Sequence, residues 1–65
     1  MPLIQITMLA GRTTQEKKAL LEAVTAAAHD SIGARVESIR VWIVETQPEC
    51  FMAGGVLAAD KKPLT

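Results

Sequence analysis

The residue with the most unusual potential chemistry in this chain is Pro2, which directly follows the initiator Met1. Methionine aminopeptidases normally remove an initiator methionine that precedes a small residue such as proline, so we expect a mature chain that begins with a secondary amine. An internal proline nitrogen is a non-basic amide, whereas an amino-terminal proline keeps an ionisable nitrogen that can serve as a general base or a nucleophile. The alternative is that Pro2 only begins a strand, a position where proline is tolerated.

Arg40 is the second candidate, because it interrupts the apolar segment 38–44. A guanidinium cannot lose its proton, so a partly buried arginine needs an anionic partner. That partner could be structural, namely Glu37, Glu45 or a carboxylate of a neighbouring subunit. It could also be the carboxylate of a substrate, which the planar fork of an arginine side chain fits well.

A strand and a helix are the first two elements that the sequence predicts to position these residues. Alternating apolar and polar residues predict a strand over residues 3–9. Thr13 and Glu16 have the spacing of a capping box, which predicts a helix from about Thr14 to Ile32, with Gly33 following it. We expect one side of this helix to face a sheet (Leu20, Val24, Ala27, Ala28 and Ser31) and the other to face solvent (Lys18, Glu22, Thr25 and His29).

A second strand is predicted over residues 38–45, with Arg40, Trp42 and Val44 on one face. A strand, a helix and a strand in this order make one β–α–β unit, whose strands should be parallel. A turn at residues 47–49 and a short hairpin or arm around Gly54 and Gly55 complete the chain. Such a small unit cannot cover both faces of its sheet.

The chain has 65 residues, 49% of them hydrophobic, which predicts a single domain over residues 1–65 with more apolar surface than it can bury alone. One cysteine allows no internal disulfide, and one cysteine and one histidine are too few for a metal site. Oligomerisation is the remaining way to stabilise so small a chain, so we expect a homo-oligomer.

Charge and hydropathy narrow the class of protein further. The formal net charge is zero, which gives no indication of a nucleic-acid partner. No apolar run approaches the roughly 20 residues that span a membrane, and the first residues lack the pattern of a signal peptide. We therefore expect a cytoplasmic protein that interacts with neither nucleic acid nor membrane.

Four segments at one consistent spacing resemble the 4-oxalocrotonate tautomerase (2-hydroxymuconate tautomerase) family of the tautomerase superfamily. These segments are residues 2–6, 9–12, 38–41 and 51–55, and the resemblance extends from Pro2 to about Ala59 without a gap. It implies an α/β (α+β) protein with the tautomerase, or MIF-like, fold. In that fold a single β–α–β unit carries a short C-terminal hairpin, and two units pair into a four-stranded sheet.

The resemblance also implies a role for each candidate residue. Pro2 is similar to the family's amino-terminal proline, which acts as the catalytic base and shuttles a proton. Arg40 is similar to the arginine that binds a carboxylate and the 2-hydroxy or 2-keto oxygen, and Arg12 to the arginine that binds the distal carboxylate from a neighbouring subunit. Phe51 is similar to the aromatic residue that makes the site apolar. Relatives of this length form homohexamers, trimers of dimers, whose active sites are shared between subunits.

The physical chemistry of these residues agrees with that assignment. An α-amine titrates at about 7.7–8.0 and a secondary amine somewhat higher, and both burial near Phe51 and nearby guanidinium groups disfavour the cation. The Pro2 amine can then be neutral and act as a base. Two arginines suit a dicarboxylate such as 2-hydroxymuconate. No cofactor is needed, because a 2-keto group beside a carboxylate already acidifies the neighbouring C–H bond.

Two alternatives stay open at this stage. One is a related tautomerase of aromatic or single-carboxylate enols such as phenylpyruvate; the other is a non-catalytic oligomeric binding protein, which would follow if Met1 is retained. A dehalogenase is disfavoured because Met52 and Ala53 stand where such relatives carry a carboxylate. Trp42 could line the site or fill a subunit core, and we expect Cys50 to be structural.

Overall fold

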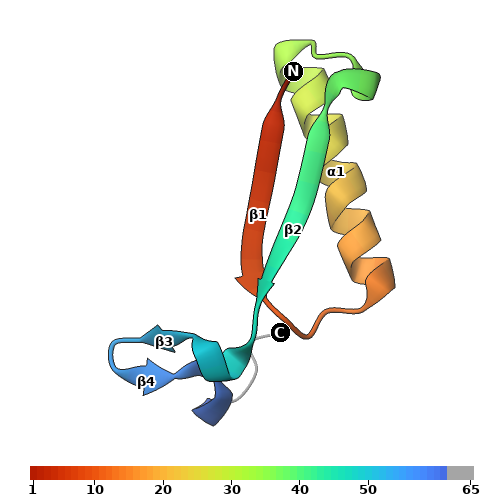
Figure 1. Ribbon diagram of the computed structural model, residues 1–65. Coiled ribbons are helices and arrows are strands. Elements are labelled where there is room, and N and C mark those ends of the chain that lie inside the picture. The colour runs from red at the N-terminus through yellow and green to blue at the C-terminus, as the bar shows by residue number, and fades with distance from the viewer. Residues whose placement is uncertain (62–65) are drawn as a thin grey trace.

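The computed structural model describes residues 1–61, which form one β–α–β unit followed by a short arm (Figure 1). Its elements are β1 (Leu3–Leu9), α1 (Thr14–Ile32), β2 (Arg40–Thr46), β3 (Met52–Ala53) and β4 (Val56–Leu57), with short 3-10 turns at Val36–Ser38, Pro48–Cys50 and Ala58–Asp60. The predicted class, a small α+β unit with a C-terminal hairpin, is confirmed.

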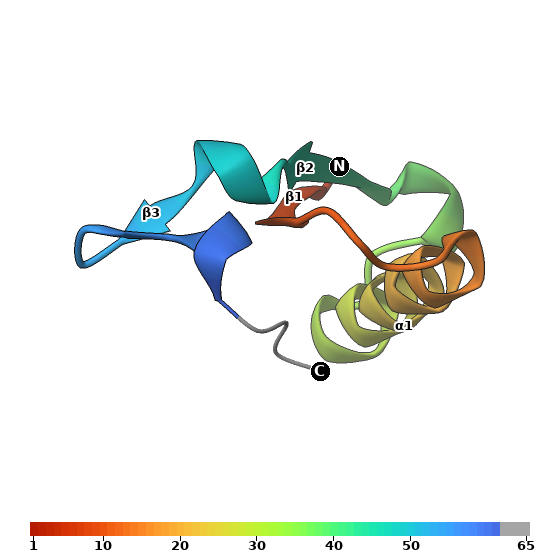
Figure 2. The ribbon, with the colours of Figure 1, turned by 90° about the horizontal axis from the view of Figure 1, so that it is seen from below.

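The two long strands pair in parallel, from Leu3 opposite Arg40 to Leu9 opposite Thr46. Helix α1 connects them and covers one face of this sheet (Figures 1 and 2). The covered face consists of half-buried apolar side chains: Ile4, Ile6, Met8, Val41 and Ile43. The residues between them are exposed, so the alternation in the sequence corresponds to a covered and an uncovered face.

Both ends of α1 are closed as the sequence predicts. The Thr13 Oγ1 atom accepts a hydrogen bond from the Glu16 N–H at 3.1 Å, and Glu16 Oε1 accepts one from the Thr13 N–H at 2.9 Å. At the other end Gly33 takes the left-handed conformation, with φ of 72°, and its N–H donates to the His29 carbonyl. The capping box and the glycine therefore account for the helix bounds.

Two predictions of detail were wrong. The second strand begins at Arg40 and not at residue 38, because the N–H and the hydroxyl of Ser38 both donate to the Arg35 carbonyl at 2.9 Å and close a turn. The helix also lies differently on the sheet, since Thr25 is half-buried and donates to the Leu21 carbonyl at 2.8 Å. Ala27 and Ser31, which were expected to face the sheet, are exposed.

A single chain leaves much of its surface uncovered. Its radius of gyration is 14.6 Å, whereas a compact chain of this length has a radius of about 11 Å. Its accessible area is 5053 Å², against roughly 4,000 Å² for a folded monomer of this mass. Ile39 is the one buried apolar residue among residues 1–61. The uncovered sheet face carries Leu3, Gln5, Thr7, Leu9, Arg40, Trp42 and Val44.

Candidate active site

Pro2 and Arg40 lie side by side because their strands are parallel and in register. The Arg40 N–H donates to the Pro2 carbonyl at 3.0 Å. This backbone bond precedes the first ladder pair, Leu3 opposite Arg40, so it holds the residue that leads into β1 against the first residue of β2. The sheet itself therefore brings together the main chains of the two residues that carry the candidate base and the candidate carboxylate-binding group.

The Arg40 side chain is held by main-chain carbonyls. Its Nη1 donates to the Glu37 carbonyl at 2.7 Å and lies 3.5 Å from the Ile39 carbonyl. Within residues 1–61 it forms no ion pair, and Glu45 pairs instead with Lys17 at 3.2 Å. The structural interpretation, an ion pair to Glu37 or Glu45 inside the chain, is thus not observed. The guanidinium is exposed and retains donors for an anion.

The turn at Val36–Ser38 was not recognised in the sequence as part of the site. It directs the Glu37 carbonyl toward Arg40, which restricts where the guanidinium can lie. The signal that could have revealed it is Ser38, because serine hydroxyls commonly bond to a nearby carbonyl and close such turns.

Arg12 and Phe51 lie at the opposite end of the sheet from Pro2. Arg12 lies in the loop between β1 and α1, and Phe51 follows the 3-10 turn Pro48–Cys50 that comes after β2. The seven residues of β1 span about 20 Å at roughly 3.3 Å per residue. One chain therefore carries two candidate residues toward each end of its sheet, and a site containing all four needs more than one chain.

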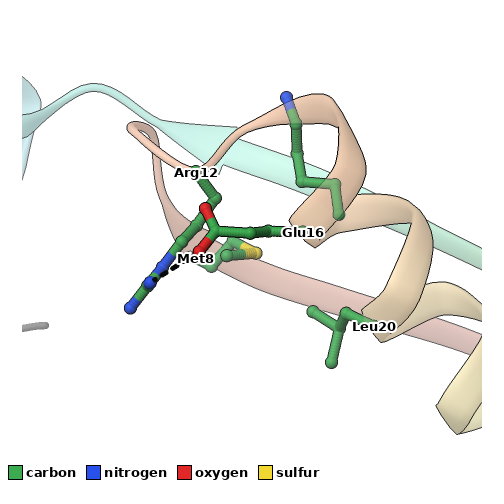
Figure 3. A pocket seen from close by; sticks show the side chains of 5 residues that line it. Met8, Arg12, Glu16 and Leu20 are labelled. Atoms are coloured by element: carbon green, nitrogen blue, oxygen red, sulfur yellow. Dashed lines mark hydrogen bonds and ion pairs between the residues drawn. The ribbon is translucent and has the colours of Figure 1, made fainter.

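A shallow hollow surrounds Arg12 where β1 meets the first turns of α1 (Figure 3). Its volume is about 220 Å³, and it is lined by Met8, Arg12, Glu16, Lys17 and Leu20. Arg12 Nη1 lies 3.4 Å from Glu16 Oε2. The hollow thus has apolar sides and a guanidinium with one carboxylate neighbour.

The charge of Glu16 is favoured by its surroundings. The hydrogen bond from the Thr13 N–H lowers the pKa of the Glu16 carboxyl below its usual value, and the positive charge of Arg12 lowers it further. A carboxylate is therefore present beside Arg12 throughout the neutral pH range.

The arm projects away from α1 (Figure 2), and its apolar side chains Phe51, Met52 and Val56 are exposed. Phe51 is 44% exposed and Met52 is 59% exposed. Gly54 and Gly55 have φ of 59° and 79°, the pair of positive values that a tight hairpin of this kind needs. The predicted hairpin is confirmed, and the chain does not cover its own Phe51.

The remaining candidates from the sequence lie outside these two groups. His29 is exposed, and its Nδ1 lies 2.8 Å from the Ala34 carbonyl at the end of the helix. Cys50 is exposed and unpaired with any cysteine. Within residues 1–61, no group of three or more potential ligands could hold a metal ion. In the same range, no helix combines the length and the apolar character that a bilayer crossing requires.

Comparison with known proteins decides the family. The family model described as "Tautomerase enzyme" matches residues 2–61, which is nearly the whole chain. The chain belongs to this tautomerase family. The resemblance stated from the sequence is therefore confirmed, and the protein is an isomerase of the keto–enol tautomerase class.

Individual tautomerases are similar to this one over most of their length. The 2-hydroxymuconate tautomerase of Comamonas testosteroni is 42% identical over 60 residues, which are 92% of this chain and 95% of that protein. The solved structure of TomN, a 4-oxalocrotonate tautomerase homologue in the tomaymycin biosynthetic pathway, is 51% identical with a TM-score of 0.86 and covers 91% of both chains.

A third similar tautomerase bears on assembly. The heterohexamer 4-oxalocrotonate tautomerase from Chloroflexus aurantiacus J-10-fl is 35% identical with a TM-score of 0.88, and the match covers 95% of this chain and all of that one. Homologous tautomerases therefore form oligomers, which accords with the uncovered sheet face and arm of this tautomerase.

Proposed function

We propose that this tautomerase interconverts 2-hydroxydienoates, or enols, with their 2-keto acids, acting without a cofactor on 2-hydroxymuconate-like dicarboxylates. The observation that carries the proposal is the 3.0 Å hydrogen bond from the Arg40 N–H to the Pro2 carbonyl. This bond joins the main chains of the two residues, and it supports a site that combines the amine formed once Met1 is removed with the Arg40 guanidinium, which has no carboxylate partner within residues 1–61.

The chemistry needs one base and one anion-stabilising group. The neutral Pro2 amine takes the proton of the 2-hydroxyl group and delivers a proton to a carbon of the conjugated chain, so the amine is regenerated in each turnover. Arg40 donates to the substrate carboxylate and to the 2-oxygen, where negative charge develops. The guanidinium beside Pro2 also disfavours the protonated amine.

We place the remaining two groups on another subunit. Arg12 and Phe51 lie at the far end of their own sheet, so they reach Pro2 and Arg40 only from a second copy of the chain. We propose a homohexamer, a trimer of dimers whose paired units form four-stranded sheets. The exposed apolar arm and the uncovered face around Trp42 and Val44 support that assembly.

Ultraviolet monitoring of 2-hydroxymuconate ketonisation tests this function. After treatment with a chelator, the protein should accelerate ketonisation over buffer without any added cofactor. We expect kcat/KM for 2-hydroxymuconate to exceed that for the enol of phenylpyruvate by about tenfold, because a charge-assisted contact to Arg12 is lost with the second carboxylate. Absence of any acceleration would refute the proposal, and a preference for phenylpyruvate would support the single-carboxylate alternative.

A further inference from the structure

A substrate carboxylate that binds Arg12 must compete with a carboxylate that already lies beside it. Arg12 Nη1 lies 3.4 Å from Glu16 Oε2, one turn further along the chain. The two side chains are 45% and 52% exposed, so the pair is accessible to a ligand entering the hollow beside β1 (Figure 3). A substrate carboxylate and Glu16 would therefore interact with the same guanidinium.

Glu16 cannot simply move aside, because the capping box holds it. Its other oxygen, Oε1, accepts the Thr13 N–H at 2.9 Å, and Thr13 Oγ1 in turn accepts the Glu16 N–H. The same bond from Thr13 lowers the pKa of the Glu16 carboxyl, so the group stays ionised. The helix cap thus keeps a fixed negative charge at the edge of the hollow.

The other charges around the hollow do not offset this effect. Lys17 also lines it, but its Nζ pairs with Glu45 Oε1 at 3.2 Å from the neighbouring strand. The charged side chains next to Arg12 in the hollow are thus Glu16 and an already paired Lys17. A second carboxylate entering there meets one guanidinium and one opposing carboxylate.

We propose that Glu16 sets the substrate range of this tautomerase by competing with a substrate's distal carboxylate for Arg12. The competition weakens the binding of dicarboxylates and leaves substrates with a single carboxylate unaffected. This inference rests on the proposed function, in which Arg12 binds the distal carboxylate. Glu16 touches no reacting atom in this scheme and acts only through Arg12.

The substitution Glu16→Gln isolates the charge from the cap. Glutamine can accept the Thr13 N–H in the same way, so the helix start and the position of Arg12 are retained while the negative charge is lost. Glu22→Gln is a matched control, because Glu22 forms the same kind of exposed pair with Lys18, at 3.3 Å, on the outer side of α1. Circular dichroism of both variants should match that of the wild type.

Steady-state kinetics with 2-hydroxymuconate and with the enol of phenylpyruvate provide the test. We expect Glu16→Gln to lower the KM for 2-hydroxymuconate roughly two- to fivefold, the range set by exposed ion pairs, with kcat unchanged. The KM and kcat of Glu16→Gln for phenylpyruvate should equal those of the wild type. Glu22→Gln should leave KM and kcat unchanged for both substrates.

Two results would overturn the inference while leaving the proposed function intact. One is an unchanged or higher KM for 2-hydroxymuconate in Glu16→Gln; the other is an equal change for both substrates. Failure of the proposed function itself looks different, because the wild type would then convert neither substrate. Inhibition constants for adipate and hexanoate provide a readout that does not depend on turnover, and Glu16→Gln should tighten the binding of adipate alone.

Discussion

Replacing Arg40 with alanine is expected to lower kcat/KM for 2-hydroxymuconate about 100- to 1,000-fold, the usual cost of removing a donor to a developing oxyanion. Strand pairing joins the main chain of Arg40 to that of Pro2, and the hydrogen bonds of the Arg40 side chain within residues 1–61 go only to main-chain carbonyls. The fold should hardly suffer, because the loss of these exposed hydrogen bonds costs about 1 kcal/mol or less.

Arg35→Ala is the matched control for this prediction. Arg35 is exposed, precedes the same 3-10 turn and carries the same charge, but it is not paired with Pro2. Its replacement should leave kcat/KM within about twofold of the wild type, as expected for a surface charge outside the site. Equal activity of Arg40→Ala and Arg35→Ala would show that Arg40 does not bind the substrate.

Replacing Val44 with glutamate should both dissociate the assembly and abolish its activity. Val44 is 41% exposed on the uncovered sheet face, beside Trp42. A new carboxylate there is solvated in a single chain, but it would be buried and unpaired if another subunit covers the face, at a cost of several kcal/mol. Activity should be lost along with the oligomer, because Arg12 and Phe51 then no longer reach Pro2 of another chain.

Sedimentation velocity and the ketonisation assay measure the two effects together. Ala23→Glu is a suitable control, since Ala23 is an exposed residue of α1 and glutamate favours helices. This control should sediment and catalyse like the wild type. An active Val44→Glu protein with unchanged sedimentation would show that this sheet face lies outside the subunit interface.

The sequence predicts the fold well where local signals are strong. The alternation over Leu3–Leu9 and the capping box of Thr13 and Glu16 predict the bounds of β1 and the start of α1 correctly. The start of β2 was misjudged because the Ser38 hydroxyl bonds within a turn, an interaction that competes with strand pairing. The face of α1 that contacts the sheet was misjudged because the small side chains of its alanines define an apolar face only weakly. The orientation of α1 about its own axis therefore depends on packing against the sheet.

The candidate site could be predicted only in part. Parallel pairing of the two predicted strands implies that Pro2 and Arg40 lie toward the same end of the sheet, whereas their adjacency depends on the register, which sets Leu3 opposite Arg40. The carbonyl groups that accept hydrogen bonds from the Arg40 side chain could not be predicted, because their positions depend on the geometry of a three-residue turn. The Arg12–Glu16 contact follows from a spacing of four residues, but its significance depends on the hollow that both residues line.

The central claim, that the Pro2 amine is the base, is tested most directly by comparing two proteins of verified mass in the ketonisation assay. One is the natural chain, and the other has a single alanine inserted between Met1 and Pro2, so that the proline nitrogen is an amide. We predict that the natural chain lacks one methionine and is active, and that the insertion lowers kcat about 100- to 10,000-fold. Full activity in the insertion variant, or in a natural chain that keeps Met1, would contradict the account.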